Sequence, residues 1–500
     1  MNDHGYILHR SIFTVIIIVA LLFTFQTALQ QLTARPQKIV LAYSGGLDSH
    51  VLLHLLARYK QLFPQHTYLA VHVHHGLSAN ADSWVEHCAN TAQALGINFV
   101  AERVNFTVEN RESLEAKARS ARYQAIALHL NTESVLLLGQ HLDDQLETFL
   151  LQLKRGAGIK GLSAMAQQMP FPLVPGCQVC RPLLDKLQLT LIDYAQQYQL
   201  SWVEDESNAD QSYDRNFLRH DIIPRLKQRW PQIASAVHRS AELCAEQQTL
   251  ADEIAQADLL LIQHSMAGLK IPQLRKLSKI RRNNVIRFWL AQLEFPMPSR
   301  HHLAKLWQEV VNAGEDANPQ LGWQAGQFRR YQDVLYNVAH YAELKDEIIV
   351  ITAAITAAIT TGITTAEICP QLITLPDNVG SLRIQLLGSD NNTAQIFHCI
   401  DGLSSSDVMN STDNLAYCVK IPAAHQRVTI RFRGQGKCQP VGRHGSRSIK
   451  KLYQEYQVAP WLRDRVPLVY YDDKLICAVG LWICAGYQAE TGLQFQLDNK

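Results

Sequence analysis

At 500 residues the chain is too long for one hydrophobic core, so we expect two to four domains. Its composition is that of an ordinary globular protein. A net charge of only +2 excludes nucleic-acid binding through overall charge, so any such binding needs a local basic patch. The cysteines are scattered, which suits reduced thiols of the cytosol better than a disulfide framework. They are Cys88, Cys177, Cys180, Cys244, Cys369, Cys399, Cys418, Cys438, Cys477 and Cys484.

The first 35 residues are interpreted as an apolar extension. Residues 12–25 are apolar over 14 positions, which is short of the roughly 20 needed to span a bilayer. They resemble the core of a signal peptide. In the leading segment, however, the negative charge of Asp3 offsets the positive charge of Arg10, and no clear cleavage site follows. We therefore expect an extra N-terminal helix within residues 1–35, which a start codon assigned too far upstream would explain. A membrane anchor and an exported protein are the alternatives.

The stretch KIVLAYSGGLDSHVLLHLL, which begins at Lys38, predicts a strand, a tight glycine turn and a helix that starts near Leu47. The two glycines let a ligand approach the backbone amides, and the start of the helix suits a phosphate. Ser44 and Ser49 add hydroxyl donors, whereas Asp48 tolerates a phosphate only if a divalent cation lies between them. An ordinary strand-to-helix turn is the alternative. The other common phosphate loop, G-x-x-x-x-G-K-[ST], does not occur in the sequence.

The hexapeptide SGGLDS at residues 44–49 resembles the pyrophosphate loop (PP-loop) of the ATP pyrophosphatase superfamily. The resemblance implies an enzyme that splits ATP into AMP and pyrophosphate while it adenylates a substrate. It also implies that Asp48 takes part in catalysis and is a ligand of Mg²⁺. The ATP-binding residues implied by the loop are Ser44, Gly45, Gly46, Leu47, Asp48 and Ser49. Amidotransferase synthetases, tRNA thiolases and tRNA-lysidine synthetases share this loop, so it does not distinguish among them.

Strands and helices alternate over residues 38–140, which predicts βαβ units and a parallel sheet covered on both faces. Further strands are expected at 67–73, 97–104 and 134–139, and helices at 79–95, 112–130 and 142–153. We place this α/β catalytic domain of the PP-loop type at residues 36–220. Its ligand is expected outside the carboxyl ends of the strands, where the loop lies.

His72 and His74 share one face at the end of the second predicted strand. This pair superficially suggests a metal site, but no further ligand spacing supports one. The resemblance implies instead that His72 lines the nucleotide pocket.

A predicted helix over residues 112–124 carries Glu115, Arg119 and Arg122 on one face. Taken alone, this pattern is typical of a solvated face with salt bridges. The sequence from Glu115 to Tyr123 is similar to the pattern E-A-x-A-R-x-x-R-Y of the tRNA-lysidine synthetase family. That resemblance implies that Arg119 contacts ATP and that Arg122 contacts tRNA.

The stretch GQHLDDQLETFLLQLKRGAG begins at Gly139 and brings Asp143, Asp144 and Glu147 to one surface of a predicted helix. Clustered carboxylates at a nucleotide site either hold Mg²⁺ or bind and deprotonate an ammonium group. Acids that merely favour a helix N-terminus are the alternative. The segment HLDDQLET resembles the same family, H-L-D-D-Q-x-E-T. The resemblance implies that all three acids bind lysine and that Asp144 and Glu147 are catalytic, one of them as the base.

The polar stretch at residues 204–224 would mean little alone, as a loop followed by a capped helix. It matches the family signature D-x-S-N…R-N…R…P, which implies the end of the catalytic domain, close to the tRNA. The implied tRNA ligands are Arg215, Asn216 and Arg219.

Three further regions are expected after the catalytic domain. Residues 221–345 have a helical pattern with few strand signals, which predicts a small helical substrate-binding domain. Residues 346–370 read as a low-complexity linker that contains the repeat ITAAITAAITTGITTA at 351–366. Short strands and Gly/Pro turns over residues 371–500 predict an α+β C-terminal domain.

The C-terminal domain contains a basic run. No acid occurs between Asp413 and Glu455, which predicts a phosphate-binding surface that would hold tRNA. A merely soluble basic face is the alternative. Arg431 and Arg433 alternate along a predicted strand and so should point the same way. The basic residues are Lys420, Arg427, Arg431, Arg433, Lys437, Arg443, Arg447, Lys450 and Lys451. Those predicted to contact tRNA are Arg431, Arg433, Arg443, Lys450 and Lys451.

From about residue 36 to the end, outside the repeat, the chain resembles the tRNA-lysidine synthetase family. The resemblance implies that ATP, with Mg²⁺, adenylates the C2 oxygen of cytidine 34 in the CAU anticodon of tRNA(Ile). L-lysine then displaces AMP through its ε-amine, so that the tRNA reads AUA and is charged with isoleucine. A cytoplasmic location follows from these substrates, and a homodimer is left open.

Two other functions stay open on the sequence alone. A tRNA thiolase of the same superfamily would use the C-x-x-C pair Cys177 and Cys180, but a lone pair is a weak signal. A non-catalytic tRNA-binding protein with a vestigial loop would release no pyrophosphate.

Overall fold

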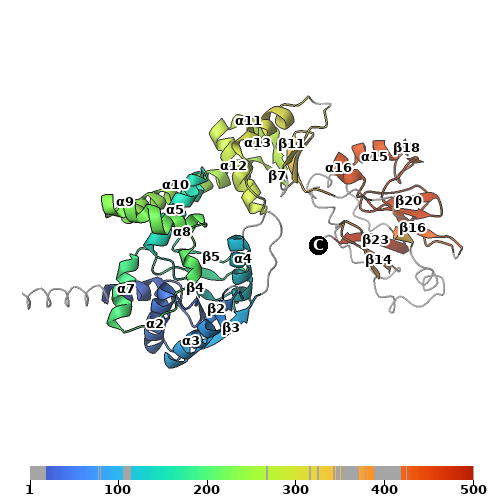
Figure 1. The fold of residues 1–500 in the computed structure, drawn as a ribbon. Helices are drawn as coiled ribbons and strands as arrows, with labels where there is room; N and C mark the ends of the chain where they lie inside the picture. The colour runs from blue at the N-terminus through green and yellow to red at the C-terminus, as the bar shows by residue number, and fades with distance from the viewer. Residues whose placement is uncertain are drawn as a thin grey trace, which may run out of the picture. The chain divides into compact units, whose positions relative to one another are not determined.

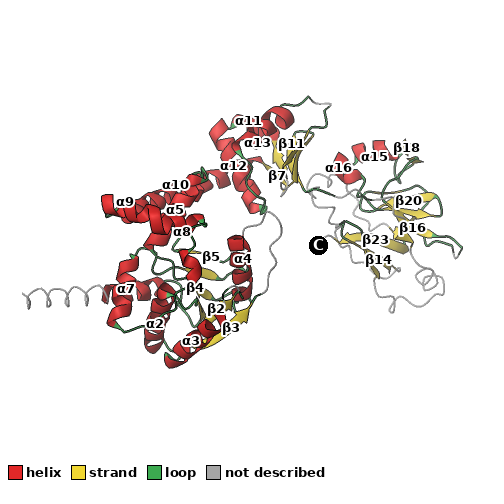
Figure 2. Cartoon of the chain, in the orientation of Figure 1, coloured by secondary structure: helices red, strands yellow, loops and turns green. Residues whose placement is uncertain are grey.

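The computed structural model describes most of the chain from residue 19 onward. The described residues are 19–104 without 77 and 79, 114–350 without 266–267, 315–316, 324–325, 342–343 and 345–348, 371–387 without 378, and 418–498 without 424. The predicted repeat at 351–366 therefore lies outside the described residues. The chain divides into two compact units, Met1–Leu250 and Ala251–Lys500. Both units combine helices and strands, as Figure 1 and Figure 2 show.

The first unit is built on a six-stranded sheet with the strand order β3-β2-β1-β4-β6-β5. All neighbouring strands are parallel except β5 and β6, which confirms the predicted parallel α/β sheet. The strand order reverses between β1 and β4, and ligands of such sheets bind at that point. The strands are β1 (Lys38–Ala42), β2 (Thr67–His74), β3 (Asn98–Arg103), β4 (Val135–Leu137), β5 (Gln168–Pro170) and β6 (Gln178–Cys180). The helices around them are α2 (Leu47–Leu62), α3 (Ala81–Ala94), α4 (Leu114–Ala127), α5 (Leu142–Lys154), α6 (Ile159–Leu162) and α7 (Gln188–Gln197).

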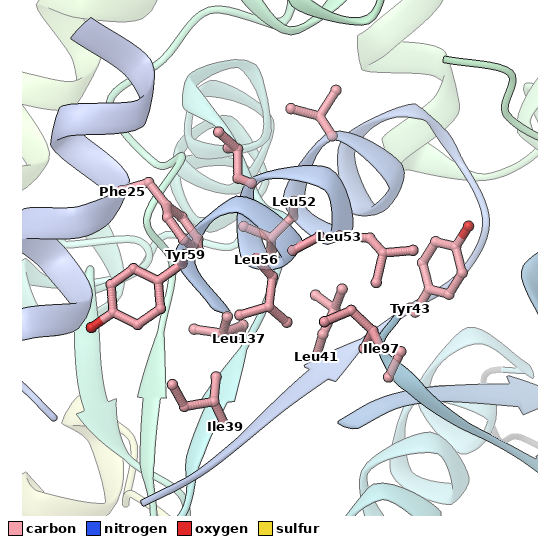
Figure 3. Packing of buried hydrophobic residues seen from close by; sticks show 14 of the residues in the cluster. Phe25, Ile39, Leu41, Tyr43, Leu52, Leu53, Leu56, Tyr59, Ile97 and Leu137 are labelled. Atoms are coloured by element: carbon pink, nitrogen blue, oxygen red, sulfur yellow. The ribbon is translucent and has the colours of Figure 1, made fainter. Parts of the chain in front are cut away.

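Successive side chains of β1 enter two different hydrophobic cores. Leu41 packs with Leu52 of α2 on one face of the sheet, as Figure 3 shows. Val40 packs with Ile126 of α4 on the other face. A strand covered on both faces needs an apolar residue at every position, which explains the continuous run of β1.

Residues 19–30 form a helix that packs into the core of the first unit. Phe25 is fully buried, and its ring meets that of Tyr59 edge-on with the centroids 5.9 Å apart (Figure 3). Leu21 and Leu29 lie four residues to either side and belong to the same buried face. The helix expected within residues 1–35 thus lies at these positions, and it packs into the core of the first unit rather than standing apart from it. Within the described part of the chain, no helix has the length and apolarity that crossing a membrane requires.

Replacing Phe25 with alanine should lower the free energy of unfolding by about 3–5 kcal/mol, because a buried ring is lost and a cavity remains. Phe23 lies on the same helix with 68% of its surface exposed. Phe23→Ala should therefore change the free energy of unfolding by less than about 0.5 kcal/mol. Urea unfolding of the two variants measures the difference, and equally small effects would show that this helix does not stabilise the core.

Helices continue the first unit beyond the sheet. They are α8 (Asp214–Phe217), a π-helical turn (Leu218–Ile222), α9 (Ile223–Arg229) and α10 (Ile233–Ile262). Because the division between the units follows Leu250, α10 carries the chain from the first unit into the second.

The second unit begins with the predicted helices and with a sheet that the sequence pattern did not predict. The helices are α11 (Ile271–Lys276), α12 (Lys279–Gln292) and α13 (Arg300–Lys305). The sheet has the order β7-β8-β11-β10-β9, and its residue Phe328 shares a core with Trp289 of α12. Its strands are β7 (Gln263–Ser265), β8 (Gly268–Lys270), β9 (Gln320–Trp323), β10 (Gly326–Tyr331) and β11 (Val334–Val338). Two of them have three residues, too few for a visible alternation of apolar and polar residues.

The described residues of the rest of the second unit are rich in β-structure and include two short helices, as the α+β prediction requires. Two five-stranded sheets have the orders β12-β16-β19-β20-β21 and β13-β14-β23-β15-β22. The helices are α15 (Ile449–Glu455) and α16 (Pro460–Arg463). The strands are β12 (Ile349–Val350), β13 (Gln371–Thr374), β14 (Ser381–Leu387), β15 (Cys418–Val419), β16 (Val428–Arg431), β17 (Lys437–Cys438), β18 (Arg447–Ser448), β19 (Leu468–Tyr471), β20 (Lys474–Ala478), β21 (Trp482–Ile483), β22 (Gln488–Ala489) and β23 (Gly492–Asp498).

The expectation that the cysteines are reduced is wrong for one pair. Cys438 of β17 and Cys484 form a disulfide, although 46 residues separate them in the sequence. A β-bridge between Pro440 and Cys484 brings the two segments together, which sequence spacing alone does not reveal. The free cysteines among the described residues are Cys88, Cys177, Cys180, Cys244, Cys418 and Cys477.

Candidate active site

The turn between β1 and α2 is held tight by its first glycine. Gly45 has a φ of +89°, a conformation that glycine adopts without steric cost. A Cβ at this position would lie 2.7 Å from Sγ of Cys88, so a larger residue would force a shift. The N–H of Val203 donates to the carbonyl of Gly45 at 3.0 Å. The backbone of the loop is thereby fixed before a ligand binds.

The two predicted serine ligands bind each other inside the loop. Their Oγ atoms are 3.0 Å apart, and Ser49 Oγ accepts the N–H of Gly45 at 3.1 Å. The N–H groups from Leu47 to Ser49 open α2, and first-turn amides have no acceptor within a helix. The N–H groups of Gly45 and Gly46 are used inside the loop, so the amides of Leu47, Asp48 and Ser49 are the donors that suit a phosphate.

The end of β4 touches the start of α2. A Cβ on Gly139, two residues beyond β4, would lie 3.3 Å from both the carbonyl carbon of Asp48 and the amide nitrogen of Ser49. Only glycine fits this approach comfortably. The chain segments that follow β1 and β4 thus meet where the strand order reverses.

Asp48 has one carboxylate oxygen without a protein partner. Its Oδ2 lies 3.5 Å from Nε2 of His141. Its Oδ1 is buried and makes no hydrogen bond to any described residue. Buried polar atoms are almost always satisfied, and Mg²⁺ takes such oxygens from one or two carboxylates together with substrate phosphates. Asp48 therefore fits the predicted Mg²⁺ ligand, although no group of three potential metal ligands occurs among the described residues.

His141 joins Asp48 to the acids of α5. Its ring Nδ1 accepts the backbone N–H of Asp143 at 3.2 Å, and its backbone N–H donates to Oδ2 of Asp144 at 3.1 Å. These two bonds cap the helix. Because Nδ1 accepts, the ring proton lies on Nε2, which is 3.5 Å from both Asp48 and Asp144. Burial lowers the pKa of His141, but the hydrogen bond to Asp48 and the three neighbouring carboxylates outweigh burial and raise it. The sequence reasoning did not name His141 as a site residue, although its position before two acids at a helix start was a usable signal.

Two predicted acids bind two predicted tRNA-binding arginines. Nε of Arg215 donates to Oε2 of Glu147 at 2.7 Å, and its Nη2 donates to Oδ1 of Asp144 at 3.3 Å. Nε of Arg219 donates to Oε1 of Glu147 at 2.6 Å, and its Nη2 donates to the same Asp144 oxygen at 3.0 Å. Glu147 is only 1% exposed. One buried network therefore connects α5 to the segment that begins with α8.

Asp143, the third predicted acid, faces other partners. Its Oδ1 lies 2.6 Å from Nζ of Lys227 on α9, and its Oδ2 accepts the N–H of Gln188 at 3.3 Å. Neighbouring helix positions point about 100° apart, so Asp143 and Asp144 diverge.

The side chain of Asn216, a predicted tRNA ligand, donates to the carbonyl of Asp210 at 2.8 Å.

The other predicted site residues of this unit lie around β2 and α4. Nδ1 of His72 is 3.0 Å from the carbonyl of Tyr43, directly before the loop. Arg119 and Arg122 are exposed on α4, where Nε of Arg122 donates to Nε2 of His75 at 3.3 Å. His72 is therefore adjacent to the loop, whereas Nη2 of Arg119 donates to the hydroxyl of Tyr123 on the same helix at 3.1 Å.

Cys177 and Cys180 belong to the two cores on opposite faces of the sheet, and both are fully buried. Burial raises the pKa of Cys177 to about 11 and that of Cys180 to about 12. Thiols of this kind stay protonated at neutral pH and are poor nucleophiles.

Acids from distant positions partly neutralise the basic run of the second unit. The strand β16 ends at Arg431, so Arg433 lies beyond it rather than alternating along the predicted strand. Lys450 and Lys451 are exposed on α15. The ion pairs of the predicted tRNA ligands join Arg431 to Asp473 at 3.2 Å, Arg433 to Asp464 at 3.7 Å and Arg443 to Glu455 at 2.5 Å.

Family models and related proteins match nearly the whole chain. The PP-loop domain matches residues 21–226, the TilS substrate binding domain residues 269–336 and the TilS substrate C-terminal domain residues 428–497. Among solved structures, the U34-tRNA thiolase NcsA from Methanococcus maripaludis covers 46% of this chain and 80% of its own at 17% identity, with a TM-score of 0.38, which is too distant to support an argument.

Two curated relatives are far more similar. The tRNA(Ile)-lysidine synthase of Shigella flexneri is 41% identical over 468 residues, which cover 93% of this chain and 97% of that protein. The enzyme of the same name from Edwardsiella ictaluri is 42% identical over 457 residues, which cover 91% and 93%. The chain therefore belongs to the tRNA(Ile)-lysidine synthase family.

Proposed function

We propose that this protein ligates L-lysine to C2 of cytidine 34 in the CAU anticodon of tRNA(Ile), with release of AMP and pyrophosphate from ATP. The observation that carries the proposal is the meeting of the PP-loop with His141 and Asp144 at the reversal of the strand order, in a chain so similar to tRNA(Ile)-lysidine synthases. The product tRNA would read AUA and be charged with isoleucine. Because ATP and tRNA are its substrates, we expect the protein to work in the cytoplasm.

The first step is adenylation of cytidine 34. Its 2-oxo group attacks the α-phosphorus of ATP, the bond to the bridging oxygen breaks, and pyrophosphate leaves. The amides of the first turn of α2 would bind the leaving pyrophosphate, because charge develops there. Mg²⁺ held by Asp48 would neutralise part of that charge.

In the second step, the ε-amine of lysine attacks C2 and expels AMP. The ammonium group must first lose a proton. Of the two predicted bases, Glu147 has both oxygens bound by arginines, whereas the arginines bind only Oδ1 of Asp144 and its Oδ2 faces His141. We therefore assign the base to Asp144 and give Glu147 the role of holding Arg215 and Arg219. Asp143 is paired with Lys227, so a lysine-binding role would require that pair to open.

Incubation with labelled L-lysine, ATP and CAU-anticodon tRNA(Ile) tests the proposal. The label should enter the tRNA, with one AMP and one pyrophosphate released for each lysine incorporated. The same tRNA with uridine in place of cytidine 34 is the control and should take up no label. Tight tRNA binding without pyrophosphate release would identify a binding protein and contradict the proposal.

The double variant Cys177→Ala/Cys180→Ala should form lysidine at an unchanged rate, because both thiols are buried and protonated. The measurement is the initial rate of lysine incorporation at saturating ATP. A tRNA thiolase would need both sulfurs, so loss of the activity in a folded double variant would favour the thiolase.

The double variant Lys450→Glu/Lys451→Glu should raise the KM for tRNA about tenfold while the KM for lysine stays the same, because both side chains are exposed and available for phosphates. In a plot of the logarithm of the tRNA association constant against the logarithm of the salt concentration, the slope should be smaller by about 2 than for the wild type. An unchanged slope would mean that α15 does not contact the tRNA.

A further inference from the structure

Among the described residues, every buried charged side chain except one binds an opposite charge. The buried charged side chains are Asp143, Asp144, Glu147, Arg181, Asp258 and Arg465. The ion pairs are Asp143 with Lys227, Asp144 and Glu147 with Arg215 and Arg219, Asp258 with Arg281, and Arg465 with Asp377. Arg181 is 5% exposed and forms no ion pair with any carboxylate that the structure describes. A buried charge without a counter-charge is costly, so its retention needs a reason.

The partners of Arg181 are neutral. Its Nε donates to Oε1 of Gln140 at 3.0 Å, and its Nη1 donates to the carbonyl of Ala166 at 2.8 Å. A guanidinium has five N–H donors, so these two bonds fix its plane and leave donors for a further ligand. Burial lowers the pKa of Arg181, Tyr123 acts to raise it, and the positive charge of Arg119 acts to lower it. None of these neighbours is a carboxylate, so a bound anion would add the counter-charge that they do not supply.

Arg181 stands at the ligand-binding edge of the sheet. It directly follows β6, which is parallel to β4, and the N–H of Leu138 beyond β4 bonds to the carbonyl of Cys180 at 3.0 Å. Its partner Gln140 directly precedes His141, whose ring contacts Asp48. The guanidinium thus lies on the far side of β4 from the PP-loop, at the same carboxyl ends of the strands where ligands of such sheets bind.

We propose that Arg181 is a second anion-binding residue of this active site and that it binds a phosphate group of a substrate. The proposal rests on the function proposed above. A planar guanidinium held at two points can bind a phosphate through paired N–H groups, which a flexible lysine cannot do as well. Two substrates carry such a group, ATP and the tRNA backbone beside cytidine 34, and the experiment separates them.

The test uses Arg181→Met and Arg181→Gln, which remove the charge, and Arg181→Lys, which keeps it. Loss of a charged hydrogen bond should raise the KM of the substrate concerned about 10- to 100-fold, with partial rescue in R181K. If ATP supplies the phosphate, the KM for ATP rises and the thermal stabilisation by ATP shrinks. If the tRNA supplies it, the KM for tRNA rises and binding of labelled tRNA weakens.

Arg58→Met is the matched control. Arg58 also donates to a neutral partner, the hydroxyl of Tyr198, but it lies about 16 Å along α2 from the loop. Both KM values should stay at the wild-type level in R58M.

Two results would overturn the proposal. One is a folded R181M and R181Q with wild-type KM values for ATP and tRNA, even if kcat falls, because Arg181 would then only position Gln140. The other is loss of the fold in both variants by circular dichroism, which would make the charge structural. A wild-type protein that forms no lysidine would instead refute the proposed function itself.

Discussion

Asp48→Asn is expected to slow pyrophosphate release by about 100- to 1,000-fold, the largest loss of activity among the variants considered. Neutral asparagine cannot supply the anionic oxygen Oδ1, which is buried without a described partner, and it weakens the contact of Oδ2 with His141. Loss of one group that stabilises developing charge in an active site has an effect of this size. A coupled phosphate assay with saturating ATP, lysine and tRNA measures the rate.

Asp193→Asn is the control for this variant, because it makes the same chemical change on α7, outside the candidate site. It should release pyrophosphate at the wild-type rate. If Asp48→Asn also kept that rate in a folded protein, Asp48 would have no part in ATP cleavage and the proposed Mg²⁺ site would be wrong.

Glu147→Gln is expected to lower the free energy of unfolding by about 3–5 kcal/mol. Glu147 is 1% exposed and binds Arg215 and Arg219, so its neutralisation leaves two guanidinium groups with the single carboxylate of Asp144. Removing one partner of a buried ion pair has a cost of this order. The same change should reduce lysidine formation, because both arginines would lose the positions that they hold beside Asp144. Urea unfolding and the lysine incorporation assay measure the two effects.

The pair Lys154–Asp214 is a close control, because it also joins α5 to α8 but is exposed at both ends, 62% and 63%. Lys154→Met should lower the free energy of unfolding by less than about 1 kcal/mol. Equal effects of the two variants would show that burial of the Glu147 network adds nothing to stability.

The PP-loop and the parallel sheet could be predicted because their determinants are local. The apolar run of β1, the glycines at 45 and 46 and the helical spacing after Leu47 specify a strand, a turn and a helix without reference to distant residues. The family resemblance then supplied the residues that surround the loop.

The pairings between distant charges could not be predicted in the same way. Glu147 and Arg219 are 72 residues apart in the sequence. The sequence predicts that Glu147 binds lysine and that Arg219 binds tRNA, whereas in the structure the two side chains bind each other. The basic run of the C-terminal region likewise lacks nearby acids in sequence, but Asp464 and Asp473 reach Arg433 and Arg431 through the fold. Linear charge patterns do not show which acid faces which base across a sheet or between helices.

Transfer of the α-phosphorus of ATP to the tRNA in the absence of lysine tests the central claim most directly. With ATP labelled at its α-phosphorus, tRNA(Ile) should acquire label at cytidine 34, and added lysine should release that label as AMP. With ATP labelled at its γ-phosphorus, the tRNA should stay unlabelled and the label should appear in pyrophosphate. Label on the tRNA from the γ-phosphorus, or lysidine formed without any adenylated tRNA, would contradict adenylation at the PP-loop.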